Sequence, residues 1–497
     1  MNPTKEDVRI LYEQMEAFYE EIVTRGNYYF DLWKDNIKRE EFVESARNLL
    51  YYLTVRRRDI RQLQKSLIPW GLSSLGRLES KTIPTLEAVL ASLKEMNGMK
   101  ADHPPISHFL LGEERLRKNT NCIFTEEEED RYTRIMVTLD SSFMEKKNIA
   151  EKLIEKGMNI ARINCSHDNE EIWLDMINKV RAASEKRNKP VKIEVEISGP
   201  KVRTSFVYTE NKNPRVSSGD MIHLCKDSKN FDAHKDAKIH IGIHAQEVFD
   251  SLDIGDQVSI DDGTVACDII SKDDDGVMLL VKRVNGDTLR VKSEQGVNFP
   301  STNFDMNLIT EKDRACIEFA CKHADIIGFS FVKSRQDIKE IRKELAKHLG
   351  DKAKDMPIMV KIETVQAVEN LPGIILEAAS TNPTCVMIAR GDLAVESGYS
   401  RLGELQQEIL WVCEASDTPV IWATEVLANQ IKRGIPTRAE ISDAAESSRA
   451  ECVMLNKGPH MLEGLELLTD ILGKMKEHHF KKTPMLRPLN IAKLHLD

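Results

Sequence analysis

Strand-like and helix-like segments alternate through residues 134–472, and this alternation constrains the fold more than any other feature. Apolar or β-branched runs occur at 134–139, 159–163 and 191–197, separated by helix-like segments at about 144–156 and 170–186. Thr310 with Asp313 predicts a helix cap at the point where the alternation resumes after residue 298. Five more such runs follow, at 325–331, 358–362, 385–388, 419–423 and 452–455. Parallel strands need helical crossovers, so eight strand–helix units predict an α/β fold of the (β/α)8 TIM barrel type. In such barrels the chemistry lies at the carboxyl ends of the strands.

The alternation stops between residues 205 and 298. This stretch has short alternating segments and turn sequences such as Ser217-Ser-Gly-Asp220 and Asp273-Asp-Asp-Gly276, without a strong helical pattern. Such a pattern is typical of a small β-domain. We therefore expect a small β-domain inserted into the TIM barrel, and the family resemblance given below implies that this domain is a β-barrel lid.

The first 130 residues are helical in pattern. Apolar residues recur at helical spacing from Val8 to Ile22, and Gly26 predicts the end of that helix. Further helices are expected over 40–67, with a basic run interpreted as a solvated face, and over 84–96. The acidic residues 126–130 predict a linker. The predicted division is an N-terminal α-helical domain (1–130), the barrel (131–204 and 299–480), the inserted lid (205–298) and a C-terminal tail (481–497).

The net charge, the hydropathy and the cysteine spacing argue against several classes of protein. The net charge of −10 argues against nonspecific nucleic-acid binding, and no apolar run approaches the length of a membrane span. None of the nine cysteines forms a CxxC pair, so the spacing predicts neither a zinc site nor a disulfide framework. We expect a cytoplasmic protein with reduced cysteines and no membrane partner.

Charged and hydroxyl residues follow the predicted strands at their carboxyl ends. Lys361 and Glu363 are two residues apart, so they point to the same face of one strand, and Asp392 follows the next strand. The other strand-end residues are Arg162, Asn164, Ser166, His167, Glu196, Arg203, Ser330, Arg390, Gly391 and Thr424. For any one of them a structural salt bridge is the simpler interpretation, but the set as a whole favours an active site.

The chemistry of these residues suits a hard cation and a phosphate. The carboxylates of Glu363 and Asp392 fit Mg²⁺ or Mn²⁺, which prefer oxygen ligands. Lys361, Arg162 and Arg203 would offset the charge of a phosphoryl group in transfer. Gly391, at a helix start, would offer backbone N–H groups to a substrate carboxylate.

With these residues in hand, the chain resembles the pyruvate kinase family over about residues 133–472. The resemblance lies in Ser198-Gly-Pro-Lys-Val-Arg-Thr204 and Ala389-Arg-Gly-Asp-Leu393, and in residues 157–167, 260–263, 296–300, 309–313, 361–363, 423–424 and 436–440. It implies a Mg-dependent enzyme that transfers phosphate from phosphoenolpyruvate to ADP, giving pyruvate and ATP. It also allows a homo-oligomer through the barrel domain.

The resemblance assigns roles by position. Glu363 and Asp392 would hold the metal, and Lys361 would stabilise the transition state and the enolate. Arg162 would bridge the phosphates, and Thr424 would lie near the path that protonates the enolate. The substrate would contact Gly391, Arg390, Ser330 and Thr424, and the nucleotide would contact Arg162, Asn164, His167 and Arg203.

The chain departs from the family at its potassium site. That site would comprise Asn164, Ser166, Glu196 and Ile197, but Glu196 and Ile197 stand where the family has Asp and Thr. Lys201 replaces the family's Glu, and family members with Lys there resemble potassium-independent enzymes. An ammonium group could replace the monovalent cation electrostatically. We therefore expect that K⁺ is not required.

Other departures leave alternatives open. The sequence Asn456-Lys-Gly-Pro459 replaces the usual Ser-Gly-Glu-Thr, Glu425 replaces a Gln, and residues after about 480 leave no room for the family's effector-binding domain. The helical N-terminal domain has no counterpart in the usual enzyme. One alternative is a catalytically weak homologue with a binding or regulatory role. Another is a metal-dependent lyase acting on a pyruvate enolate, against which the inserted lid argues.

Overall fold

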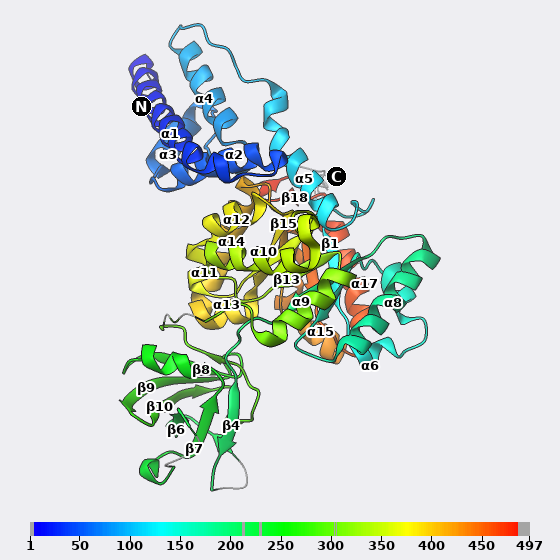
Figure 1. Cartoon of the computed structure of the whole chain (residues 1–497). Coiled ribbons are helices and arrows are strands. Elements are labelled where there is room, and N and C mark those ends of the chain that lie inside the picture. The colour runs from blue at the N-terminus through cyan, green and yellow to red at the C-terminus, as the bar shows by residue number, and fades with distance from the viewer. Residues whose placement is uncertain (1–3, 211–213, 228–230, 303, 305, 486–497) are drawn as a thin grey trace, which may run out of the picture.

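The computed structural model describes residues 4–485, apart from residues 211–213, 228–230, 303 and 305. It shows a closed barrel of eight parallel strands with a seven-stranded sheet at one end and a helical region at the other (Figure 1). In the predicted tail 481–497, Thr483–Pro484 (β19) pairs with His479–Phe480 (β18), and residues 486–497 lie outside the described residues.

The barrel confirms the predicted (β/α)8 fold. Its strands are hydrogen-bonded in the order β1-β17-β16-β15-β14-β13-β3-β2, which is chain order around a closed ring. Two strands match the predicted bounds, and the others differ by one or two residues at an end. The strands are β1 (Arg134–Thr138), β2 (Ile160–Asn164), β3 (Lys192–Ile197), β13 (Ile326–Phe329), β14 (Ile358–Ile362), β15 (Thr384–Ala389), β16 (Val420–Ala423) and β17 (Cys452–Leu455).

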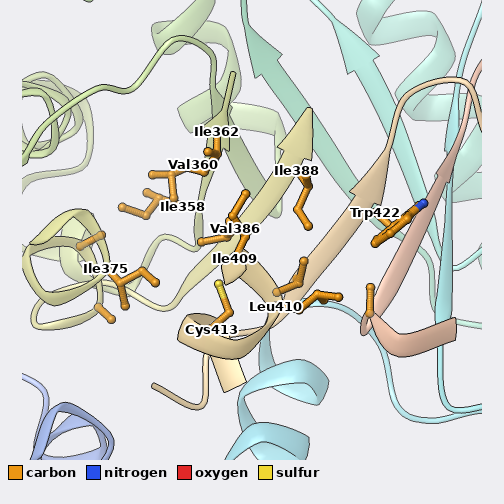
Figure 2. Packing of buried hydrophobic residues seen from close by; sticks show 14 of the residues in the cluster. Ile358, Val360, Ile362, Ile375, Val386, Ile388, Ile409, Leu410, Cys413 and Trp422 are labelled. Atoms are coloured by element: carbon orange, nitrogen blue, oxygen red, sulfur yellow. The ribbon is translucent and has the colours of Figure 1, made fainter. Parts of the chain in front are cut away.

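The pleat of β14 determines which of its side chains enter the barrel. Ile358, Val360 and Ile362 belong to the large core formed with the outer helices, where α12 (Leu371–Ala379) and α14 (Tyr399–Ala415) pack against the strands (Figure 2). Met359 instead belongs to a separate cluster inside the barrel. Because side chains alternate along a strand, Lys361 shares the inward face of Met359.

The helix predicted over 144–156 is wrong in its bounds. The structure has two short helices there, α6 (Ser141–Met144) and α7 (Ile149–Glu155). Asn148 precedes α7 with a φ of 57°, in the left-handed region that helices cannot continue through. The helix expected from about 170 to 186 is α8 (Glu170–Arg187), and the cap predicted at Thr310 begins α9 (Glu311–His323).

The inserted residues form a seven-stranded sheet in the order β12-β8-β9-β10-β6-β7-β4, in place of the small β-barrel expected from sequence. All its pairings are antiparallel except β6 with β7, which is parallel. Its own apolar core is separate from that of the barrel. The strands are β4 (Thr204–Tyr208), β6 (Met221–Cys225), β7 (Ile239–Ile243), β8 (Gln257–Ile260), β9 (Val265–Asp273), β10 (Gly276–Val284) and β12 (Val297–Asn298).

Two predictions for the N-terminal helices are wrong. Gly26 does not end the first helix, because α1 extends over Lys5–Trp33. The second helix is interrupted after Arg56, giving α2 (Val43–Arg56) and α3 (Arg61–Leu67). The third is confirmed as α4 (Thr82–Met96), and α5 (Leu111–Ile123) was not predicted. Within the described part of the chain, no helix has both the length and the hydropathy to cross a membrane.

The N-terminal helices pack against the end of the barrel opposite the inserted sheet (Figure 1). Ser45 on α2 donates to Asp417 Oδ2 over 2.7 Å, and Arg115 on α5 pairs with the same oxygen at 2.6 Å. Trp33 donates its indole N–H to Ser380 Oγ over 3.2 Å. Asp417 and Ser380 both lie in loops that lead into barrel strands, so this helical region covers the amino ends of the strands.

Candidate active site

A polar cavity of about 250 Å³ opens at the carboxyl ends of the barrel strands. Three of the predicted site residues, Ile197, Arg390 and Gly391, are not among its lining residues. The predicted residues that do line it are Arg162, Asn164, Ser166, His167, Glu196, Lys201, Arg203, Ser330, Lys361, Glu363, Asp392 and Thr424.

Lys361 lies at the buried base of this cavity. Its Nζ is 2.9 Å from Glu363 Oε1 and 3.1 Å from Glu196 Oε1, and it donates to Ser330 Oγ over 2.9 Å. Burial opposes the charged form, but the two carboxylates outweigh it and raise the pKa of Lys361. The lysine is therefore a permanent positive charge, held by three neighbouring strands.

Arg162 and Glu196 form the second buried pair. The guanidinium donates from Nε to Glu196 Oε2 over 2.9 Å and from Nη2 to Oε1 over 2.7 Å, while Nη1 reaches Thr138 Oγ1 at 2.9 Å. Burial works against ionisation of Glu196, yet Arg162 and Lys361 together hold its pKa well below the usual value. Glu196 thus balances two cations that a bound phosphate would also attract.

Glu363 and Asp392, the predicted metal ligands, are held by different cations. Burial raises the pKa of Glu363, an effect that Lys361 opposes and the charge of Asp392 reinforces. Asp392 is paired with Lys201, whose Nζ is 2.8 Å from Asp392 Oδ1 and 2.9 Å from Asp262 Oδ1. Two carboxylates that repel each other at one cavity are a donor set that fits Mg²⁺ or Mn²⁺, which would relieve this repulsion.

The predicted nucleotide side lies after β2 and β3. Asn164 Oδ1 accepts the Ser166 backbone N–H over 2.9 Å, and the Ser166 and Ser198 hydroxyls are 2.8 Å apart. Burial and the charge of Lys457 lower the pKa of His167, so its ring favours the neutral form. Arg203 donates to the Glu294 carbonyl over 2.9 Å and faces the cavity.

The residues of the predicted monovalent-cation site contact different partners. Glu196 binds Arg162 and Lys361, as described above, whereas Lys201 extends to Asp392 and Asp262. The Ile197 carbonyl accepts the Ser330 backbone N–H over 3.2 Å. Gly199, between Ile197 and Lys201, has a φ of 65°, and an added Cβ would lie 2.8 Å from the Ser330 carbonyl oxygen. The turn after β3 therefore depends on glycine for its close approach to β13.

Arg390, the first residue of α13 (Arg390–Ser397), binds the loop after β16 that contains Thr424. Arg390 donates to the carbonyls of Ala423 at 2.8 Å and Thr424 at 2.6 Å, pairs with Asp443, and stacks on Trp422 with 4.8 Å to the ring centroid. Its guanidinium thus holds the end of β16. Thr424 and the following Glu425 have φ values of 70° and 58°, a costly conformation for non-glycine residues.

Several residues of the site were missed by sequence reasoning. Asp262 comes from the inserted sheet, and Asn456 and Lys457 from the loop after β17, which the sequence marked only as a departure from the family. Glu194 lies two residues before Glu196 on the same inward face, where burial and the Glu196 charge raise its pKa well above the usual value. The period of two along β3 could have identified Glu194.

The chain is similar to proteins of one family over the region that builds this site. Residues 130–459 match the family model described as pyruvate kinase, barrel domain. A pyruvate kinase of Hypocrea jecorina is 33% identical over 343 residues, which are 68% of this chain and 60% of that protein. A pyruvate kinase of Thermotoga maritima is 30% identical over 348 residues, which are 69% of this chain and 70% of that protein.

A solved structure shows the same fold. The crystal structure of a pyruvate kinase from Cryptosporidium parvum superposes with a TM-score of 0.62 at 25% identity, covering 70% of this chain and 69% of that one. The chain thus spans about two thirds of the length of these proteins, and 60% of the Hypocrea jecorina one. The family model covers residues 130–459, which contain the barrel strands and the inserted sheet.

Proposed function

The chain belongs to the pyruvate kinase family, and from this we propose that it transfers a phosphoryl group from phosphoenolpyruvate to ADP. In this reaction the bond between the enol oxygen and phosphorus breaks, and a terminal oxygen of the ADP β-phosphate forms the new bond. The remaining enolate takes up a proton at carbon, so the products are pyruvate and ATP.

The observation that carries the proposal is the position of Lys361. Its permanent ammonium charge lies at the base of the cavity, within 3.1 Å of Glu196, Glu363 and Ser330, and next to the buried Arg162–Glu196 pair. Positive charge fixed in a buried site stabilises a phosphoryl group and a developing enolate without reorganisation.

Glu363 and Asp392 would hold a divalent metal, Mg²⁺ or Mn²⁺. When bound, such an ion supplies charge neutralisation and orientation of substrate oxygens. The chain's own contribution is to hold Glu363 through Lys361 and to offer Asp392 once Lys201 moves away. The ammonium of Lys201 would then remain beside the cavity as a built-in monovalent cation, which supports independence from K⁺.

The other residues bind and orient the reactants. Arg162 would bridge the phosphates, and Asn164, His167 and Arg203 would face the nucleotide. Ser330 and the backbone at Gly391 would contact the substrate, and Thr424 would lie near the path of the proton to carbon. Arg390, bound to two carbonyls and to Asp443, would position Thr424 and Gly391 without touching the substrate itself.

The inserted sheet would act as a lid over the cavity. Lys201 joins Asp262 of the sheet to Asp392 of the barrel, and Asn298 donates to Glu396 Oε1 over 2.9 Å. We propose the division into residues 1–130, 131–204 with 299–480, and 205–298, because each of these parts has its own elements and the two sheets have separate cores.

The test is a coupled assay for pyruvate with phosphoenolpyruvate, ADP and Mg²⁺. The full chain should release pyruvate only when ADP is present. Lys361→Met should lower kcat by about 10²-fold to 10³-fold, the usual effect of removing one electrostatic stabiliser. Lys192→Met, at the amino end of β3 and thus far from the cavity, should retain activity. Two controls would distinguish a loss of catalysis from a loss of folding. These are the melting temperatures of the variants and the activity of Lys361→Arg, which keeps the positive charge.

A second candidate is a homologue that binds nucleotide without turnover. The ion pair between Lys201 and Asp392 favours this second candidate, because the Lys201 ammonium group is bound to a carboxylate that would have to bind the metal. It predicts no pyruvate release, while Mg²⁺ with ADP raises the melting temperature; a ligand at 100 times its Kd adds about 2.7 kcal/mol. ADP-independent release of pyruvate, or full activity in Lys361→Met, would contradict the proposed phosphotransferase.

A further inference from the structure

A cluster of histidine and cysteine side chains lies in the inserted sheet, on strands that the proposed chemistry does not use. His223 and Cys225 are two residues apart on β6, so they point to one face of the sheet. β7 runs parallel to β6 in a register that places His240 directly beside His223. The strand pairing therefore brings three side chains that commonly bind metals to one spot.

The ligand atoms of the three side chains converge. The Nδ1 atoms of His223 and His240 are 3.2 Å apart, and the Sγ atom of Cys225 is 3.3 Å from His223 Nδ1. All three ligand atoms lie within 4.8 Å of one another. The three residues are 1% to 6% exposed, so the cluster is buried.

The separations of His223 Nδ1 from the other two ligand atoms, 3.2 and 3.3 Å, are close to the edges of a tetrahedral zinc site. Zinc binds nitrogen at about 2.0–2.1 Å and thiolate sulfur at about 2.3 Å, so tetrahedral geometry sets neighbouring ligand atoms about 3.3–3.6 Å apart. A metal-free cluster held by hydrogen bonds explains the contacts among these three side chains less completely than a zinc site does. His223 Nδ1 lies 3.2 Å from a nitrogen and 3.3 Å from a sulfur, and one ring nitrogen can form a hydrogen bond with only one of them.

A second layer surrounds the three residues. The His234 ring lies against His223 at an interplanar angle of 33°, with centroids 3.8 Å apart, and ligand atoms of His223, His234 and Asp273 also lie within 4.8 Å of one another. Phe231 covers His240, with 4.8 Å between ring centroids. A carboxylate and an apolar shell behind ligating histidines fix the orientation of the rings.

We propose that His223 Nδ1, Cys225 Sγ and His240 Nδ1 bind one Zn²⁺ ion in the inserted sheet, with water as the fourth ligand. Zinc suits this set because thiolate and imidazole are its usual ligands, whereas Mg²⁺ prefers oxygen. On binding, the Cys225 thiol loses its proton to solvent as the sulfur–zinc bond forms, and both histidines bind as neutral rings. The ion would cross-link β6 and β7.

The test uses the full chain, purified under reducing conditions without chelator. Zinc content by mass spectrometry should be one ion per chain for the wild type and for Cys267→Ser, a buried cysteine of β9 in the same sheet. Cys225→Ser and His240→Ala should lower zinc affinity at least tenfold. Cobalt substitution should give a thiolate-to-cobalt absorption band in the wild type that Cys225→Ser lacks.

A measurement on the wild type alone tests the proposal even if the variants do not fold. A chelator should lower the melting temperature of the wild type, and equimolar Zn²⁺ should restore it. Folded wild-type protein that takes up no zinc would overturn the proposal in favour of a metal-free, hydrogen-bonded cluster. Unchanged zinc affinity in Cys225→Ser, or a cobalt spectrum without the thiolate band, would overturn it as well.

Discussion

Lys201 Nζ lies 2.8 Å from Asp392 Oδ1, so the lysine that follows β3 is paired with the carboxylate proposed to hold the metal. The same Nζ is 2.9 Å from Asp262 Oδ1 in the inserted sheet. Burial opposes the charged form of Lys201, but Asp392 and Asp262 outweigh it and raise its pKa, so the ammonium charge is permanent near neutral pH. One side chain thus connects the inserted sheet, the barrel and the proposed metal site.

The first prediction concerns metal affinity. Mg²⁺ must displace the Lys201 ammonium from Asp392 or share the carboxylate with it, so Lys201→Met should tighten Mg²⁺ binding. A partly exposed ion pair contributes up to about 1 kcal/mol, which corresponds to roughly fivefold in Kd. Titration calorimetry with Mg²⁺ measures this. Lys282→Met, on an exposed lysine of β10 in the same sheet, is the control and should leave the Kd unchanged. Weaker Mg²⁺ binding in Lys201→Met would contradict the prediction.

The second prediction concerns potassium. If the Lys201 ammonium replaces the monovalent cation, the rate of the wild type should be the same in K⁺ and in tetramethylammonium at equal ionic strength. Lys201→Glu removes that charge and restores an acidic residue, so its rate should rise several-fold on adding K⁺. The measurement is the coupled assay at saturating phosphoenolpyruvate and ADP. A several-fold gain for the wild type would refute potassium independence.

The barrel and most of its site were predictable because they depend on local periodicity. The period of two along β14 placed Lys361 and Glu363 on one face, and the structure shows Lys361 Nζ 2.9 Å from Glu363 Oε1. Strand counting then placed Asp392 at the same mouth, since β15 is hydrogen-bonded to β14. Both steps need only the alternation of side chains and the rule that parallel strands end at one side.

The misjudged helices have one tertiary and one local cause. In the sequence pattern, Gly26 predicts the end of a helix. In the structure an added Cβ at Gly26 would lie 2.1 Å from the Tyr51 ring, so the glycine allows α1 and α2 to pack closely. The expected helix over 40–67 breaks where Asp59 Oδ1 accepts the Arg61 backbone N–H over 3.1 Å, a local bond that competes with the helix. The pairs Lys201–Asp392 and His223–His240 join residues that are well separated in the sequence, so no local sequence pattern predicts them.

The third prediction tests the close approach of Gly391 to the loop after β16. An added Cβ at Gly391 would lie 2.9 Å from Thr424 Cγ2, and Thr424 has little freedom to move because its carbonyl accepts Arg390. Gly391→Ala should displace Thr424 and lower kcat/KM at least about tenfold, the size expected for a small misplacement at a reacting centre.

Gly403→Ala is the matched control for that experiment. Gly403 lies in α14, and an added Cβ there meets nothing within 4 Å. Alanine in an exposed helix is favoured over glycine by about 1 kcal/mol, so this variant should be active and slightly more stable. Equal kcat/KM in Gly391→Ala and the wild type would show that Thr424 is not required in its observed position.

The last prediction concerns the contact between the N-terminal helices and the barrel. Asp417 is fully buried there, with Ser45 and Arg115 bound to Oδ2. Burial raises the pKa of Asp417 to about 6, although Arg115 and Ser45 oppose the shift. In the unfolded chain the carboxyl titrates near its ordinary pKa of about 3.9. The folded state therefore binds this proton more tightly than the unfolded state does.

The sign of the pH dependence follows from this difference. The stabilisation from protonated Asp417 is complete below about pH 4 and is lost as the pH rises through about 6, by an amount on the order of 3 kcal/mol. Asp417→Asn keeps the hydrogen bond from Ser45 without a titrating group, so its stability should fall less than that of the wild type between pH 4.5 and 7.5. Urea unfolding at the two pH values measures this, with Asp470→Asn on the exposed face of α17 (Met461–Met475) as the control. The same loss of stability in Asp417→Asn as in the wild type would mean that Asp417 stays ionised throughout, held by Arg115 against the effect of burial.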